Sequence, residues 1–116
     1  MSERKIYSID ILVDLSGGDS TFICEMIHMF ISHSDAFMND MNNAIIAGDI
    51  VTLKQKAHKY KTSAQLFQIQ DLHASLAKLE SFVDFSKKQE MDDVLKNINK
   101  LSMLAVKQLK DELKNY

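Results

Sequence analysis

The chain has 116 residues, with no proline, three glycines and a formal net charge of −2. This length suits one domain over residues 1–116 that buries its own core, and the scarcity of helix breakers favours an all-α fold over a β-rich one. The small net charge excludes a general attraction to nucleic acid or to an anionic membrane, and no apolar run has the length of a signal peptide or a transmembrane helix. The single cysteine, Cys24, excludes an internal disulfide and fits a reducing compartment, so we expect a cytoplasmic protein.

The first predicted element is a short helix or turn within residues 5–15. Its apolar side chains recur at helical spacing, at Ile6, Ile9, Leu12 (or Ile11) and Leu15. The sequence Ser-Gly-Gly at 16–18 then breaks the helix, because glycine supplies backbone angles that other residues avoid. Asp19 is placed to cap the helix that follows.

A long amphipathic helix is predicted over residues 20–47. Gly48 is placed to end it and Asp49 to cap the next helix, which runs from residue 50 to residue 67 or 70. A hinge of two residues implies that these helices form an antiparallel hairpin.

Two further helices complete the chain. Asp71 is placed to cap a helix that reaches about residue 85 and carries an apolar stripe of Leu72, Leu76, Leu79 and Val83. After a polar turn at 86–89, a last amphipathic helix covers about residues 90–115. Four sizeable helices joined by short turns pack most simply as an antiparallel up-down-up-down bundle, to which the short N-terminal helix is an addition.

The helix over residues 50–67 carries a histidine, His58, beside its apolar face. At 100° per residue, the core stripe is formed by Leu53, Ala57, Tyr60, Ala64 and Phe67. An adjoining arc, roughly 80° to 180° from Leu53 on the same count, holds Lys54, His58, Lys61, Thr62 and Gln65. We therefore expect the imidazole at the surface, among lysines that favour an approaching anion such as a phosphoryl group or an acidic protein surface.

Helix geometry suggests a partner for this histidine. If the turn after the His58 helix is centred near Ile69, His58 and Glu80 each lie eleven residues from it, at similar heights about 16 Å away. A carboxylate at Glu80 can accept the proton of one imidazole nitrogen, fix the tautomer and leave the other nitrogen free as a nucleophile. The alternative, which periodicity leaves open, is a solvated glutamate on a helix face.

Other chemistry finds less support in the sequence. Cys24 and His28 are four residues apart and able to share a metal, but no second pair of ligands accompanies them. We expect His28, His33 and His73 to be surface or boundary residues. No glycine-rich phosphate loop, nucleophile elbow or paired-histidine zinc motif is present.

Several motifs, in this order and spacing, resemble the histidine-containing phosphotransfer (HPt) family over nearly the whole chain. They are Leu12 to Leu15 with Ser16-Gly17-Gly18-Asp19, Phe22-Ile23-Cys24-Glu25 with Phe30, Gly48-Asp49, Ala57-His58-Lys59-Tyr60-Lys61-Thr62-Ser63, and Leu72 through Leu79-Glu80. The resemblance implies that His58 carries a phosphoryl group and exchanges it with an aspartate of a response-regulator receiver domain. It implies that Lys61 contacts phosphoryl oxygens from the open face of the helix and that Glu80 orients the imidazole.

The resemblance also implies partners. The surface that meets the receiver domain is expected to include Lys54, Lys59, Thr62 and Gln65. The domain is expected to have no catalytic machinery, cofactor or metal of its own, since the receiver supplies an acidic pocket and Mg²⁺. A hybrid histidine kinase is a further expected partner of an otherwise monomeric domain, and nucleic acid and membranes are not expected ones.

Two positions depart from the family pattern. The family usually has glycine four residues after the histidine, which keeps space open for the partner, but this chain has Thr62. It often has glycine ten residues after the histidine as well, where this chain has Gln68. Thr62 bears on partner choice and transfer rate more than on the role itself.

Three hypotheses follow. The leading one is a stand-alone phosphorelay carrier, because no kinase, receiver or sensor segment accompanies the domain. The second is a module that docks on a receiver or kinase without carrying phosphate, which Thr62 would suit. The third is an unrelated helical interaction protein with an incidental histidine.

Overall fold

The computed structural model describes residues 4–116, so residues 1–3 of the expected domain lie outside it. Within that range the chain is all-helical, and no strand occurs in it. The elements are α1 (Asp10–Ser16), α2 (Ser20–Ala47), α3 (Ile50–Leu66), α4 (Gln70–Glu80), α5 (Lys88–Glu112) and a terminal 3₁₀ turn, η1 (Leu113–Asn115). None of the described helices is long and apolar enough to cross a bilayer.

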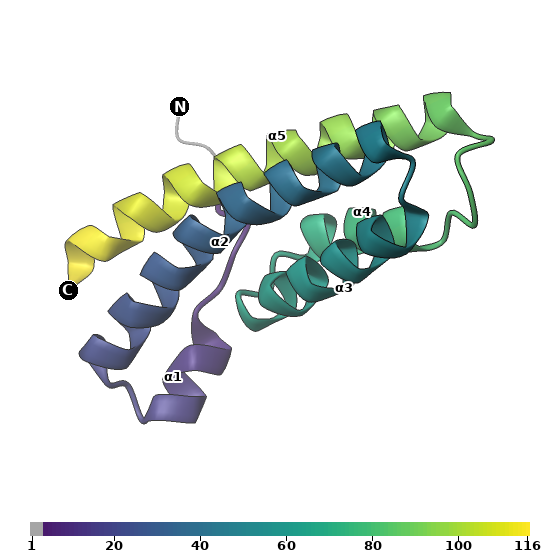
Figure 1. The fold of residues 1–116 in the computed structure, drawn as a ribbon. Coiled ribbons are helices and arrows are strands. Elements are labelled where there is room, and N and C mark those ends of the chain that lie inside the picture. Colours follow the sequence, from purple (N-terminus) through teal and green to yellow (C-terminus); the bar gives the residue numbers. More distant parts are fainter. Residues whose placement is uncertain (1–3) are drawn as a thin grey trace.

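Helices α2 to α5 enclose one core. Helix α2 contacts α3 and α5, and α4 contacts α3 and α5 in turn. In Figure 1, the short pair α3 and α4 lies beside the part of α2 that leads into α3, while α1 lies near the first half of α2. The α3–α4 pair therefore carries His58 and Glu80, and α2 and α5 lie behind this pair.

The predicted helix ends at the α1–α2 and α2–α3 turns are confirmed. Asp19 accepts a hydrogen bond from the Thr21 backbone amide at 2.9 Å, which fixes the start of α2. Gly48 ends α2 in the left-handed region, with φ of 68°. Asp49 accepts from both the backbone amide and the hydroxyl of Thr52, and these hydrogen bonds, the side-chain one first, lower the pKa of its carboxyl group.

The N-terminal prediction is wrong in part. Helix α1 begins at Asp10, and residues 4–9 before it have no regular secondary structure, with the Ser8 amide donating to the Phe67 carbonyl at 2.8 Å. That bond places the segment against the end of α3, where it is held without helical structure. Leu12 is fully buried, whereas Leu15 is exposed, so of these two predicted apolar positions only Leu12 faces the core.

The prediction for α4 is wrong at both ends. It starts at Gln70, one residue before the expected cap at Asp71, and it stops at Glu80. Beyond it the chain turns and buries Phe82, while Val83, which was expected in the apolar stripe, is exposed. The turn is favoured because an aromatic ring removes more apolar surface from water than valine does.

One buried polar cluster ties α3 to the helices behind it. Tyr60 is fully buried, and its hydroxyl lies 2.7 Å from the hydroxyl oxygens of Ser34 on α2 and Ser102 on α5. Its ring stacks on Phe37 of α2, with ring centroids 5.1 Å apart. Burial raises the pKa of Tyr60, so the hydroxyl stays protonated and these bonds stay in place.

A second polar cluster, which we call the terminal clasp, surrounds the buried carboxylate of Glu112 and joins residues near the two ends of the described chain. It consists of Tyr7, Glu112, Asn115 and Tyr116, with Lys5 beside it. The Tyr7 hydroxyl donates to one carboxylate oxygen of Glu112, and Asn115 and Tyr116 donate to the other. Burial and the bond to Glu112 raise the pKa of both tyrosines, that of Tyr116 to about 12.

Candidate functional site

His58 lies at the surface of α3, as periodicity predicts. Leu53, Ala57, Tyr60 and Ala64 on the same helix are fully buried, so the core stripe is confirmed. The His58 side chain lies outside this stripe and is 67% exposed. An imidazole so placed is accessible to a second protein.

Glu80 is the partner of this imidazole. Its Oε1 lies 2.9 Å from His58 Nδ1, which is the contact that counting residues from the α3–α4 turn predicts. Glu80 is the last residue of α4, and its side chain is only 21% exposed. Because a carboxylate can only accept, this contact favours the tautomer of the neutral imidazole that has its proton on Nδ1 and a free lone pair on Nε2.

We expected the Lys61 side chain on the open face of α3, but the structure places it beside Glu80. Its Nζ donates to Glu80 Oε2 at 3.0 Å, and its side chain is as little exposed as that of Glu80. The expectation failed because a helical wheel places the Cβ atom, whereas the flexible stem of a lysine sets the position of its charge. Each oxygen of Glu80 thus has one partner, the imidazole on Oε1 and the ammonium on Oε2.

The residues expected to face a partner divide into two groups. Lys54 and Lys59 line an open hollow of about 550 Å³ together with His58, Glu80 and Gln55. Gln55 was not predicted, although on the same count it lies just beyond the arc that holds His58.

Thr62 and Gln65 lie outside this hollow. Both are exposed, and Gln65 lines a second hollow beside Gln68 instead. The Thr62 hydroxyl donates to the backbone carbonyl of His58, one helical turn back, at 3.3 Å.

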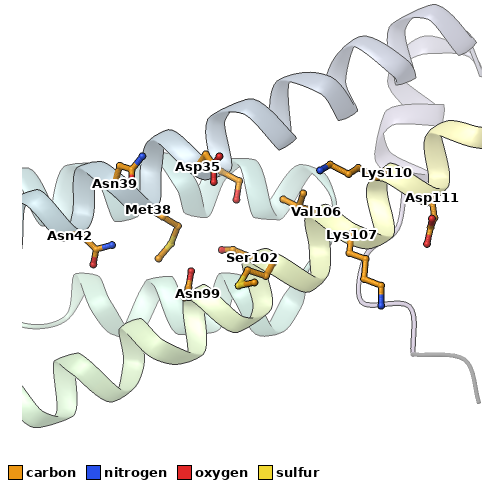
Figure 2. Close-up of a pocket in the computed structure, with 12 residues that line it drawn as sticks. Asp35, Met38, Asn39, Asn42, Asn99, Ser102, Val106, Lys107, Lys110 and Asp111 are labelled. Carbon is orange, nitrogen blue, oxygen red and sulfur yellow. The ribbon is translucent and has the colours of Figure 1, made fainter.

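A further hollow in the described part of the chain lies away from the histidine. Figure 2 shows this groove, of about 570 Å³, between α2 and α5. Polar side chains such as Asn39, Asn42 and Asn99 line it, and no residue of α3 or α4 does. It is therefore separate from the histidine.

The metal-ligand pattern gives no site within residues 4–116. No group of three or more histidine, cysteine, aspartate or glutamate side chains there is placed to hold an ion. His28 and His33 are exposed, and Cys24 and His73 are half-buried.

Comparison with known proteins assigns the family. The sequence model of the Hpt domain matches residues 25–116, a range that contains the histidine and its two partners. This chain belongs to the Hpt domain family. The resemblance stated from its motifs is confirmed, and the function class is that of a phosphorelay histidine carrier in two-component signalling.

A solved structure shares the fold of this Hpt domain. The crystal structure of histidine-containing phosphotransfer protein B (HptB) from Pseudomonas aeruginosa PAO1 superposes with a TM-score of 0.83 and covers 98% of this chain and 99% of that one. The two sequences are 16% identical, so the match establishes the shared fold. A comparison with curated protein sequences gives no match.

The second departure from the HPt pattern has a structural counterpart. Gln68 adopts a left-handed backbone with φ of 51°, which glycine tolerates better than other residues. Its side-chain Oε1 is buried and has no hydrogen-bond partner among the described residues. The usual glycine of the HPt pattern was the sequence signal for this strained turn between α3 and α4.

Proposed function

We propose that His58 is the phosphorylated histidine of this Hpt domain and that Nε2 exchanges the phosphoryl group with an aspartate of a receiver domain. The observation that carries the proposal is the contact between Nδ1 and Glu80 on an otherwise exposed ring. It supports a nucleophile whose lone pair points outward before any partner arrives. Holding a reactant in this geometry lowers the entropic part of the barrier.

The transfer needs no proton movement at the imidazole. The Nε2 lone pair attacks phosphorus, a P–N bond forms, and the P–O bond to the receiver aspartate breaks with its electron pair left on the carboxylate. Throughout, the proton stays on Nδ1, where Glu80 stabilises the positive charge that develops on the ring. In the reverse direction the same ring leaves as neutral imidazole with the Nδ1 proton in place.

The receiver supplies the remaining chemistry in this proposal. Its acidic pocket and Mg²⁺ offset the charge on the transferred oxygens, so the Hpt domain needs no metal of its own. Lys54 and Lys59 line the hollow beside His58 and favour an acidic surface. Thr62, on the same face, narrows the set of receivers that fit.

The finer organisation belongs to the same proposal. The ring of contacts from α2 to α3, α4 and α5 supports the up-down-up-down order of a four-helix bundle. We also propose that the carrier is monomeric and cytoplasmic and that a hybrid histidine kinase is a further partner.

Phosphorylation of the protein tests the role of His58. The assay incubates the protein with a receiver charged by acetyl phosphate, or with kinase, receiver and ATP. We expect an acid-labile, alkali-stable label on the wild type that disappears in His58→Gln. The matched control is His28→Gln, which removes an exposed histidine on α2 and should keep the label. Label retained in His58→Gln, or no label on the wild type with any receiver of the source organism, would overturn the proposal.

Thr62 favours a second candidate, a module that docks without carrying phosphate. Its exposed side chain lies one helical turn after His58, where it limits the approach of a phosphorylated aspartate. Receiver binding by an unlabelled wild type would support this candidate, whereas labelling that increases in Thr62→Gly would assign Thr62 to partner access instead.

A further inference from the structure

The contact between Lys61 and Glu80 bears on a question that the proposed function leaves open, namely what the lysine does. Its Nζ is 3.0 Å from Glu80 Oε2, and both side chains are 21% exposed. Ion pairs shielded from water in this way are stronger than fully exposed ones. The resting position of the ammonium is therefore beside the carboxylate.

The geometry of the imidazole separates this ammonium from the transferred group. Nδ1 and Nε2 point in different directions from the ring, and Glu80 contacts Nδ1. Lys61 contacts the other oxygen of the same carboxylate and is not among the residues that line the hollow beside His58. The ammonium is thus bound to the carboxylate that contacts Nδ1, whereas the phosphoryl group would be carried by the other nitrogen, Nε2.

We infer that Lys61 is a positioning residue that acts through Glu80, holding the carboxylate against Nδ1 so that Nε2 is the unprotonated nitrogen. This role rests on the proposed function of His58 and differs from the direct contact with phosphoryl oxygens that the family resemblance implies. Removing the ammonium leaves Glu80 with one oxygen unpartnered in a partly buried place, free to turn toward water. The Nδ1 proton then loses its fixed acceptor, and the Nε2–H tautomer becomes populated.

The first test reads the tautomer of His58 in the unphosphorylated protein. The ¹⁵N NMR shifts of the ring distinguish a protonated from an unprotonated nitrogen. We expect Nε2 to be unprotonated in the neutral ring of the wild type and partly protonated in Lys61→Met. Lys61→Arg, which keeps a charged donor for Oε2, should restore most of the wild-type spectrum. An unchanged tautomer in Lys61→Met would overturn the inference.

The matched control is Lys56→Met. Lys56 lies on the same helix and forms a comparable, partly exposed ion pair with Asp40 at 3.3 Å, away from the histidine. It should leave the tautomer and the transfer rate as they are in the wild type. A tautomer change in Lys56→Met equal to that in Lys61→Met would assign the effect to general loss of charge on α3 and reject the inference.

The second test combines Lys61→Met with Glu80→Gln. Glutamine at position 80 can still accept from Nδ1, but it has no charge for Lys61 to hold. If Lys61 acts through Glu80, Lys61→Met slows transfer to the receiver roughly tenfold in the wild-type background and has little further effect beside Glu80→Gln. Equal slowing in both backgrounds would show that the ammonium acts on the phosphoryl group directly, against the inference.

The two readouts keep this inference separate from the proposed function. If wild-type protein takes no label, the proposal for His58 fails, but the tautomer measurement still decides whether Lys61 holds Glu80. If labelling succeeds and the His58 tautomer is unchanged in Lys61→Met, the proposal for His58 stands and the inference for Lys61 fails.

Discussion

Replacement of Tyr7 by phenylalanine should destabilise the domain by opening the terminal clasp. Tyr7 is 9% exposed, and its hydroxyl donates to the buried carboxylate of Glu112. Phenylalanine keeps the ring in the core and keeps the contact with Lys5, whose ammonium lies 4.7 Å from the ring centroid. The substitution therefore removes the hydrogen bond and little else.

The size of the effect follows from the charge of the acceptor. A hydrogen bond to an ionised group contributes about 1.5–3 kcal/mol to stability, roughly twice the value for a neutral pair. Among the residues that the structure describes, Oε1 of Glu112 keeps Lys5, at 4.0 Å, in Tyr7→Phe, while Oε2 keeps Asn115 and Tyr116. We expect a loss of about 1.5–3 kcal/mol in the free energy of unfolding at pH 7.

Urea denaturation followed by circular dichroism measures this loss. Tyr116→Phe is the control, because Tyr116 donates to the same carboxylate but is 43% exposed, so its loss should be smaller. A loss below about 0.5 kcal/mol in Tyr7→Phe, the range of ordinary surface substitutions, would refute the assignment of the clasp to stability.

The same variant should change how stability depends on pH. Burial, the largest influence, raises the pKa of Glu112, but the hydrogen bonds from Tyr7, Asn115 and Tyr116 and the charge of Lys5 together lower it below its ordinary value. The unfolded chain therefore binds this proton more readily than the folded chain does. The contribution of ionised Glu112 to the free energy of unfolding is present above the pKa that this group has in the unfolded chain, and it is lost as the pH falls through its lower pKa in the folded chain. In that pH range, the free energy of unfolding of Tyr7→Phe should fall less steeply with decreasing pH than that of the wild type.

Three more substitutions test the fold around the site. Tyr60→Phe leaves the buried hydroxyls of Ser34 and Ser102 without their bridge and should cost about 1–3 kcal/mol in urea denaturation; a loss near zero would show that the bridge is dispensable. Gln68→Gly relieves a left-handed backbone and removes a buried unpaired oxygen, so thermal melting should show a gain of about 1 kcal/mol, and a decrease would contradict the strain argument. Asp49→Ala removes the cap of α3 and should cost about 1 kcal/mol by the same denaturation assay, with an unchanged midpoint counting against the cap.

The parts of the structure that the sequence predicts are those set by local geometry. Helical periodicity placed the core stripe of α3, and the preferences of aspartate and glycine placed the ends of α2. The contact between His58 and Glu80 was predictable because the rise of a helix is constant, so equal distances from a turn bring two residues to equal heights.

The parts that could not be predicted depend on how far a side chain extends, on which of two apolar side chains enters the core, and on contacts between distant residues. The position of the Lys61 charge follows from an acceptor on another helix, which the wheel of α3 does not contain. The end of α4 depends on whether Phe82 or Val83 enters the core, and both choices continue a plausible apolar pattern. The terminal clasp joins Tyr7 and Glu112 across 105 residues, a contact that no local pattern encodes.

The hydroxyl bridge at Tyr60 has a consequence for the histidine two residues before it. Two positions along a helix differ by about 200°, so a helix held at Tyr60 from one side presents His58 on the other. Were α3 free to turn by about 20° about its axis, a ring roughly 6 Å from that axis would travel about 2 Å. Misplacement of a reacting atom by about 1 Å can cost a hundredfold in rate. The hydrogen bonds of Tyr60 thus restrict rotation of α3 about its axis, and they fix the direction in which the imidazole is presented at the surface.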